Sequence, residues 1–183
     1  MPFIKIQKKH CQSIHFAIVF PIGSLDDPVG KCGVAHIVEH MAFRKAGKLT
    51  QEDIYDKCES LGVKIDAKTG KNFISFQFAC RKSIFKTVLS LLYEMLKEQN
   101  YSQKDLQEEK SVVLAEIVQK EPTNMQLIFD SRWTNTAFSN SILGTETSIA
   151  NISLTDIIKY KNKLFLTDFS IVLVGNFDET DLN

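Results

Sequence analysis

The sequence predicts an α+β fold in which helices pack on one side of a mostly antiparallel sheet. Short segments alternate apolar and polar residues, which is the period of a half-buried strand. Longer segments repeat apolar residues at the helical period, and the order of strands and helices along the chain favours separate helical and sheet layers. We expect one domain over residues 1–183, because the chain can bury a sizeable core and shows no linker or repeat.

Two strands and one helix are expected in the first part of the chain. Residues 3–6 and 14–20 are expected to be strands, and the second is rich in isoleucine, valine and phenylalanine. Residues 23–30 are expected to form a loop, since glycine, proline and aspartate favour turns. The helix should run from about Gly33 to Arg44, and its residues are apolar almost all round, which predicts that it is buried.

A capped helix and a pair of strands follow. Thr50 is a typical N-cap with Asp53 three positions later, and Gly62 is a typical residue to end a helix. Residues 63–67 and 72–80 are expected to be strands that pair around a glycine turn, since apolar residues alternate clearly in the second of them.

The second half is expected to be mainly helical and to end in a strand. Pro122 stops one helix, and Ser153 with Asp156 forms a capping box that begins another. The expected elements are helices over residues 83–99, 102–121, 124–137 and 153–163, and a buried strand over residues 169–175.

Composition is that of an ordinary soluble globule, with 44% apolar and 24% charged residues. The 22 basic and 22 acidic side chains cancel, so no nucleic acid partner is expected. The four cysteines form no C-x-x-C pair and are expected to be reduced and mostly buried. Residues 1–10 are too polar for a signal peptide and no apolar stretch is long enough to span a membrane, so we expect a cytoplasmic protein.

The strongest functional signal is the run His36-Ile37-Val38-Glu39-His40. On a helix, His36 and His40 lie one turn apart on the same face and can bind one cation, while Glu39 points to nearly the same side. H-x-x-E-H is the inverted form of a zinc-protease pattern, and it predicts a zinc-activated water with a glutamate as its base. The alternative is chance spacing, which is rare in a chain with only four histidines.

A catalytic zinc site needs a third protein ligand, and the helix over residues 102–121 offers two candidates. Glu109 and Glu116 are two turns apart, face the same way and have apolar neighbours. A buried carboxylate needs a partner, which a zinc site would supply. The same spacing fits the partly solvated edge of an amphipathic helix, so the residues alone leave both interpretations open.

Three other candidate ligands are weaker. Cys32 lies eight residues before His40, about 12 Å along a helix axis, which is too far for both histidines and the thiol to share one metal. His10 and His15 lie in or beside a strand, where a single histidine is usually structural or exposed.

The paired motifs resemble the pitrilysin-type zinc peptidases, a family that includes insulin-degrading enzyme and the mitochondrial processing peptidase. The resemblance extends over nearly the whole chain and implies a fold like one half-domain of these enzymes. It is carried by residues 19–28, 33–43, 108–117, 144–146 and 174–178.

The resemblance implies Zn²⁺ as cofactor, with His36, His40 and Glu116 as its ligands and Glu39 as the catalytic general base. Glu109 matches a second glutamate of the family, which supports the site from outside the ligand shell. Spacing alone left the roles of these two glutamates open. The resemblance assigns Glu116 as a zinc ligand and Glu109 as a supporting residue.

The resemblance also implies that extended peptides add as a strand to a sheet edge beside the zinc. That edge corresponds to residues 63–69, with Asp66, Ala67 and Thr69 as substrate-binding residues. Asp66 departs from the family, which usually has asparagine there. An acid would alter peptide docking or favour a basic substrate residue.

Members of the family carry two related halves that close into a chamber, and the second half donates an arginine and a tyrosine to the substrate. None of Arg44, Arg81 and Arg132 has a tyrosine at the matching spacing, so residues 1–183 are expected to be one catalytic half. A second homologous chain or half-domain would complete it, as a hetero- or homo-oligomer.

The function expected from these features is a zinc-dependent endopeptidase that hydrolyses short or unfolded peptides. The alternative is a non-catalytic, peptide-binding subunit of a peptidase complex, with a structural or vestigial zinc site.

Overall fold

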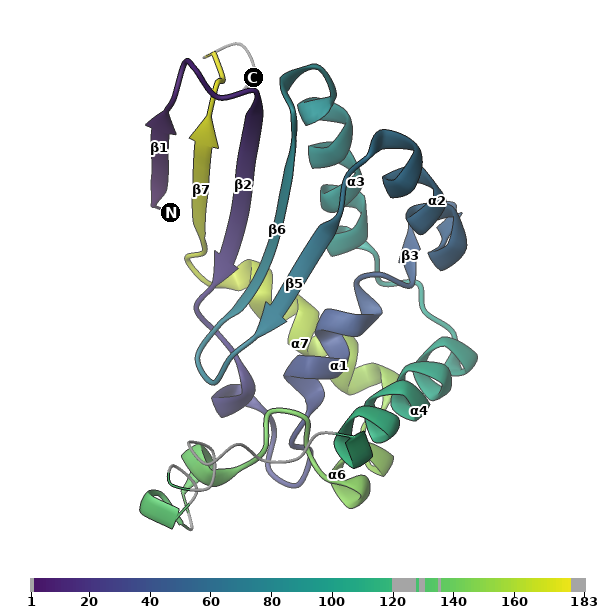
Figure 1. Cartoon of the computed structure of the whole chain (residues 1–183). Helices are drawn as coiled ribbons and strands as arrows, with labels where there is room; N and C mark the ends of the chain where they lie inside the picture. Colours follow the sequence, from purple (N-terminus) through teal and green to yellow (C-terminus); the bar gives the residue numbers. More distant parts are fainter. Residues whose placement is uncertain (1, 120–127, 129–130, 135, 179–183) are drawn as a thin grey trace.

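A five-stranded sheet forms the centre of the computed structural model, which describes residues 2–119, 128, 131–134 and 136–178 (Figure 1). Neighbouring strands are antiparallel except at one edge, where β1 and β7 run parallel. The α+β class and the mostly antiparallel sheet are confirmed. The strand order across the sheet is β1 (Phe3–Gln7), β7 (Ser170–Gly175), β2 (Ser13–Phe20), β6 (Ile74–Arg81) and β5 (Ile65–Thr69).

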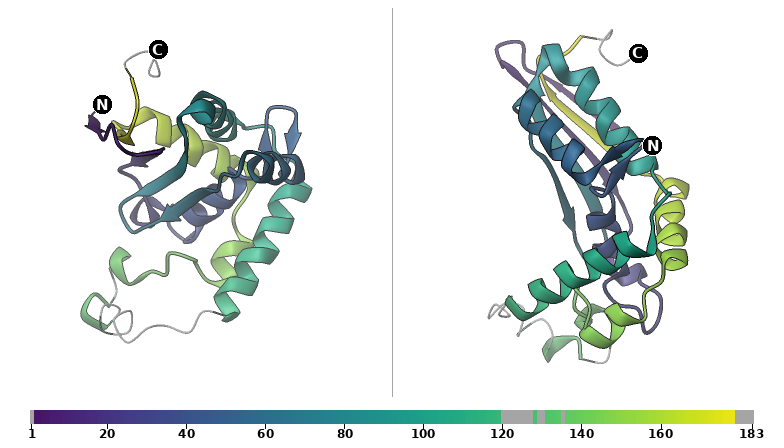
Figure 2. Two further views of the ribbon diagram at one scale, coloured as in Figure 1. Left: turned by 45° about the horizontal axis from the view of Figure 1, so that its top comes forward. Right: turned by 90° about the vertical axis from the view of Figure 1, so that its right-hand side faces the viewer.

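Among the described residues, helices cover one face of this sheet and leave the other uncovered. Along β2 the side chains of Ile14, Phe16, Ile18 and Phe20 are buried, while those between them are exposed or half-buried. The covered face carries α3 (Phe85–Lys97) and α7 (Leu154–Leu166), which lie on the same side in both views of Figure 2. One-sided burial explains why the strand sequences alternate so clearly.

Aromatic side chains join the sheet to α3. Phe16 and Phe78 face each other across β2 and β6 with ring centroids 5.2 Å apart, and Phe85 packs against both at 6.3 and 6.0 Å. The first residue of α3 is therefore anchored in the core. This helix is shorter than the expected 83–99, because a 3₁₀ turn over Lys82–Ile84 precedes it.

Helix α1 (Val34–Met41) is buried, as expected, but ends three residues before Arg44. It packs against α7, against α4 (Gln103–Gln119) and against β5. Its N-cap Gly33 has a φ of +99°, and the Asp27 carboxylate accepts hydrogen bonds from the backbone N–H groups of Gly33 and Ala35 at 2.7 and 2.8 Å. The loop before α1 therefore fixes where the helix begins.

Helix α2 (Gln51–Leu61) has both of its predicted ends. Thr50 and Asp53 form a reciprocal capping box, and Gly62 ends the helix in the left-handed region with a φ of 63°. A two-stranded hairpin that was not predicted comes just before it, formed by β3 (Lys45–Ala46) and β4 (Leu49–Thr50).

The remaining elements differ in detail from the expected ones. The Ser153 and Asp156 capping box is present, and α7 continues to Leu166 rather than ending near Lys163. Short helical segments that were not predicted are α6 (Glu146–Ala150) and 3₁₀ turns over Ser24–Asp26 and Ala137–Ser139. The expected helix over residues 124–137 and the end of the helix at residue 121 lie largely outside the described residues.

All four cysteines are free thiols, but only Cys58 and Cys80 are buried, so the expectation that most of them are buried was wrong. Within the described part of the chain, no helix is both long and apolar enough to cross a membrane.

Candidate zinc site

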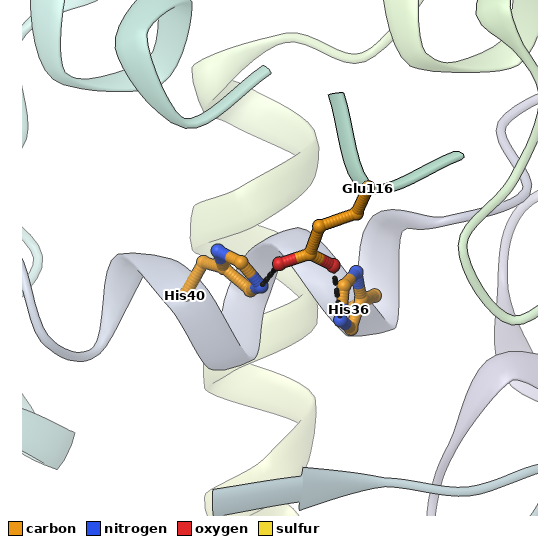
Figure 3. Close-up of side chains that lie close together, drawn as sticks. All are labelled: His36, His40 and Glu116. Atoms are coloured by element: carbon orange, nitrogen blue, oxygen red, sulfur yellow. Dashed lines mark ion pairs between the residues drawn. The ribbon is translucent and has the colours of Figure 1, made fainter. Parts of the chain in front are cut away.

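Helices α1 and α4 bring together two imidazoles and a carboxylate (Figure 3). His36 and His40 lie one turn apart on α1, with ring centroids 4.5 Å apart. Glu116 extends from α4 so that each of its oxygens faces one ring. The distance from Glu116 Oε2 to His36 Nε2 is 3.7 Å, and that from Oε1 to His40 Nε2 is also 3.7 Å.

This donor set fits a zinc ion. One ligand atom from each of the three side chains lies within 4.8 Å of the others, and no other such group occurs among the residues that the structure describes. Zinc bonds of about 2.1 Å in a tetrahedron place neighbouring ligand atoms roughly 3.4 Å apart. Two imidazoles with one carboxylate also make up a known catalytic zinc set, which leaves a position open for water.

Glu109 lies behind His40 rather than beside Glu116. Its side chain is almost fully buried, and Oε2 is 3.1 Å from His40 Nδ1. A neutral His40 that donates from Nδ1 to this carboxylate keeps its Nε2 lone pair toward the site. The interpretation as a solvated helix edge is therefore wrong for Glu109, whereas Glu116 is half-exposed.

Burial and the neighbouring charges act on the pKa of His40 in opposite directions. Burial lowers the pKa of His40, but the hydrogen bond to Glu109 and the negative charge of Glu116 raise it, and the net result is a pKa above the ordinary value. The second oxygen of Glu109 accepts a hydrogen bond from Arg44 Nη1 at 3.2 Å. No role for Arg44 was predicted, since no motif in the sequence marks it.

Glu39 lies on α1 between the two histidines and accepts a hydrogen bond from the Thr69 hydroxyl at the end of β5. Burial raises the pKa of Glu39, although this hydrogen bond and the nearby His40 act in the opposite direction. A carboxyl group with a raised pKa, beside a candidate metal site, has the properties of a general base.

An open cleft of about 540 Å³ borders Glu39 and His40 and extends between α2 and β5. Phe43, Ile54 and Val63 line this cleft with apolar side chains. Its polar lining includes Glu39 and Glu109. The cleft therefore connects the candidate zinc site to the strand at the sheet edge.

The three residues that the resemblance assigned to substrate binding lie on this edge strand in different surroundings. Asp66 and Ala67 line the cleft, and the Asp66 carboxylate forms an ion pair with Lys64 at 2.7 Å. Thr69 instead contacts Glu39, an interaction that was not predicted. Strand β5 is the last strand of the sheet, so one side of its backbone is not paired within the sheet.

The weaker candidates from the sequence lie away from the donor set. His10 and His15 are exposed, and His15 Nε2 contacts the Ser13 hydroxyl at 3.2 Å. Cys32 precedes α1, and its carbonyl accepts a hydrogen bond from Ser148.

Comparisons with known proteins agree on one family. Residues 3–149 match the family model described as insulinase, peptidase family M16. The human mitochondrial-processing peptidase subunit beta is 26% identical over 132 residues, which cover 70% of this chain and 27% of that protein. An uncharacterized zinc protease of Rickettsia bellii is 22% identical over 179 residues, 94% of this chain and 43% of the relative.

Among solved structures, pitrilysin superposes with a TM-score of 0.84 at 18% identity, covering 98% of this chain and 20% of that one. The fold of this chain thus matches one part of the longer pitrilysin chain. The chain spans less than half the length of these relatives.

Proposed function

The chain belongs to the insulinase family of peptidases, and from this membership we propose that it is the catalytic half of a zinc-dependent endopeptidase. The observation that carries the proposal is the convergence of His36, His40 and Glu116, with Glu39 beside them. A coincidental H-x-x-E-H sequence would not bring a third ligand from another helix to both imidazoles.

The residues of the site divide into zinc ligands, a general base and residues that hold these in place. His36, His40 and Glu116 would hold the zinc ion, which when bound lowers the pKa of a water molecule beside it and polarises the substrate carbonyl. Glu39 takes a proton from the attacking water, and Thr69 holds the Glu39 carboxylate in place. Glu109 fixes the tautomer and the ring orientation of His40.

We propose that the substrate is an extended segment of a short or unfolded peptide. The free edge of β5 runs beside the cleft that borders Glu39 and His40, and a peptide can add to such an edge through its main chain. Asp66 and Ala67 would contact the bound peptide there. Binding through the main chain explains how such a site would accept many sequences.

A second, homologous half would complete the chamber and supply the arginine and tyrosine that the family's second half donates to the substrate. One of the relatives is itself a subunit, the beta subunit of the mitochondrial-processing peptidase. The isolated chain is expected to be slow, because groups that stabilise the developing oxyanion are missing. The four free thiols support a reducing, cytoplasmic setting.

Metal analysis of three proteins tests the site. The wild-type chain is expected to bind one zinc ion, Glu116→Ala to lose most of it, and Glu39→Gln to keep it, since Glu39 is not a ligand. Glu116 is half-exposed, so the substitution should not prevent folding. Full zinc occupancy in Glu116→Ala would overturn the ligand set. A zinc-loaded complex that binds peptides without cleaving them would favour the non-catalytic subunit.

A further inference from the structure

We infer that Arg44 is a positioning residue of the zinc site, acting on His40 through the buried carboxylate of Glu109. The inference rests on the proposed function, because it concerns how one of the proposed ligands is held. Two contacts carry it, from Arg44 to Glu109 and from Glu109 to His40 Nδ1. Glu116 faces the other ring nitrogen of His40, Nε2.

Arg44 connects three helices, α1 through its backbone and α2 and α4 through its guanidinium. Arg44 lies just after α1, where its backbone N–H donates to the carbonyl of Met41 at 3.2 Å. Its Nη1 donates to Gln51 Oε1 at the start of α2 at 2.6 Å, and its Nη2 donates to Glu108 on α4. The Arg44 side chain is only 13% exposed, although its partner Glu108 is 45% exposed.

Glu109 is held at both of its oxygens. Oε1 accepts from Arg44 Nη1 at 3.2 Å, and Oε2 is 3.1 Å from His40 Nδ1. The Glu109 side chain is 5% exposed, so water cannot replace a lost partner at low cost. Without Arg44 the carboxylate would lose the cation that fixes one end, and its hold on the imidazole would loosen.

Lys45 provides a matched comparison. It is the next residue, and its Nζ forms an ion pair with Asp105 at 3.2 Å, in the same acidic cluster that Arg44 contacts at 3.5 Å. Among the described contacts, none joins Lys45 to Glu109. Lys45 thus shares the electrostatic surroundings of Arg44 but not its connection to His40.

The test is the zinc affinity of the purified chain, measured by competition with a chromophoric chelator. Loss of a group that orients a ligand typically costs 10- to 100-fold in metal affinity, so Arg44→Met should weaken zinc binding about tenfold. Lysine keeps the charge but not the planar fork, so Arg44→Lys should recover part of the loss. Lys45→Met should bind zinc as the wild type does.

A double-mutant cycle separates positioning from a general loosening of the fold. In a Glu109→Gln background, Arg44→Met should cause little further loss of affinity, because the residue through which Arg44 acts has been altered. If Arg44→Met alone does not fold, Arg44→Lys replaces it in both backgrounds, since lysine keeps the buried positive charge and loses only the planar fork.

Two results would overturn the inference. Wild-type zinc affinity in folded Arg44→Met would show that Arg44 does not act on the site, and an equal loss in both backgrounds would show that it does not act through Glu109. Failure of the wild-type chain itself to bind zinc would instead refute the proposed function.

Discussion

Gly33 is the N-cap of the helix that carries both histidines, and its replacement by alanine gives a sharp test of how that helix is placed. Gly33 has a φ of +99°, and a Cβ atom would lie 2.7 Å from the Leu143 carbonyl oxygen and 2.6 Å from Ile149 Cδ1. Gly30 is a matched control with a φ of +76°, where a Cβ atom would meet nothing within 4 Å.

The expected magnitudes follow from two separate costs. The left-handed backbone costs an L-residue about 1 kcal/mol, and this applies to both variants. Forcing atoms into a packed region adds roughly 1–3 kcal/mol, and this applies to Gly33→Ala alone. The loss of chain freedom in the unfolded state is the same for both and cancels in the comparison. Gly33→Ala should therefore lose about 2–4 kcal/mol and Gly30→Ala about 1 kcal/mol.

Urea unfolding of the metal-free chains measures both free energies of unfolding. Zinc affinity should fall only in Gly33→Ala, because a shift at the start of α1 moves His36 relative to Glu116. Equal losses of stability in the two variants would refute the claim that close packing at Gly33 places this helix.

Three further expectations follow from individual contacts. Thr69→Val removes the hydroxyl that donates to Glu39 and should lower kcat about tenfold, whereas Thr69→Ser should retain the wild-type kcat. An effect on KM alone would assign Thr69 to substrate binding instead. Tyr160→Phe should cost about 1.5 kcal/mol by unfolding, because the buried hydroxyl donates to the Gly23 carbonyl at 2.6 Å; an unchanged free energy of unfolding would contradict this. Burial lowers the pKa of Lys161 to about 7, so between pH 7 and its ordinary value of 10.5 the unfolded chain binds more protons and stability should rise with pH. Lys161→Met should remove this rise, and an identical pH dependence in both proteins would count against it.

The main features of the fold and site could be predicted because local signals carried them. One-sided burial of the sheet made the strand alternation visible, and the capping boxes at Thr50 and Ser153 marked two helix starts. The four-residue spacing of His36 and His40 was enough to place them on one helical face.

Other features could not be predicted, for identifiable physical reasons. The parallel pairing of β1 with β7 joins residues about as far apart as the chain allows, and nothing local signals it. Strands β3 and β4 have two residues each and α6 has five, which is too short for periodicity to show.

The functions of the two glutamates on α4 also needed tertiary contacts. Glu109 and Glu116 have the same helical phase, and only the position of α1 places one behind His40 and the other in front of it. Arg44 and Thr69 act through long-range contacts with Glu109 and Glu39, which spacing in the sequence does not show.

The most direct test of the central claim is cleavage of a quenched, unstructured peptide by the purified zinc-loaded chain. Wild-type protein, the same protein with a chelator, and Glu39→Gln at equal zinc content should be compared. We expect slow cleavage that the chelator abolishes and that Glu39→Gln lacks, with the rate rising when a homologous second half is added. Cleavage at the wild-type rate in Glu39→Gln, or none by the fully zinc-loaded wild type even with that second half, would contradict the proposal.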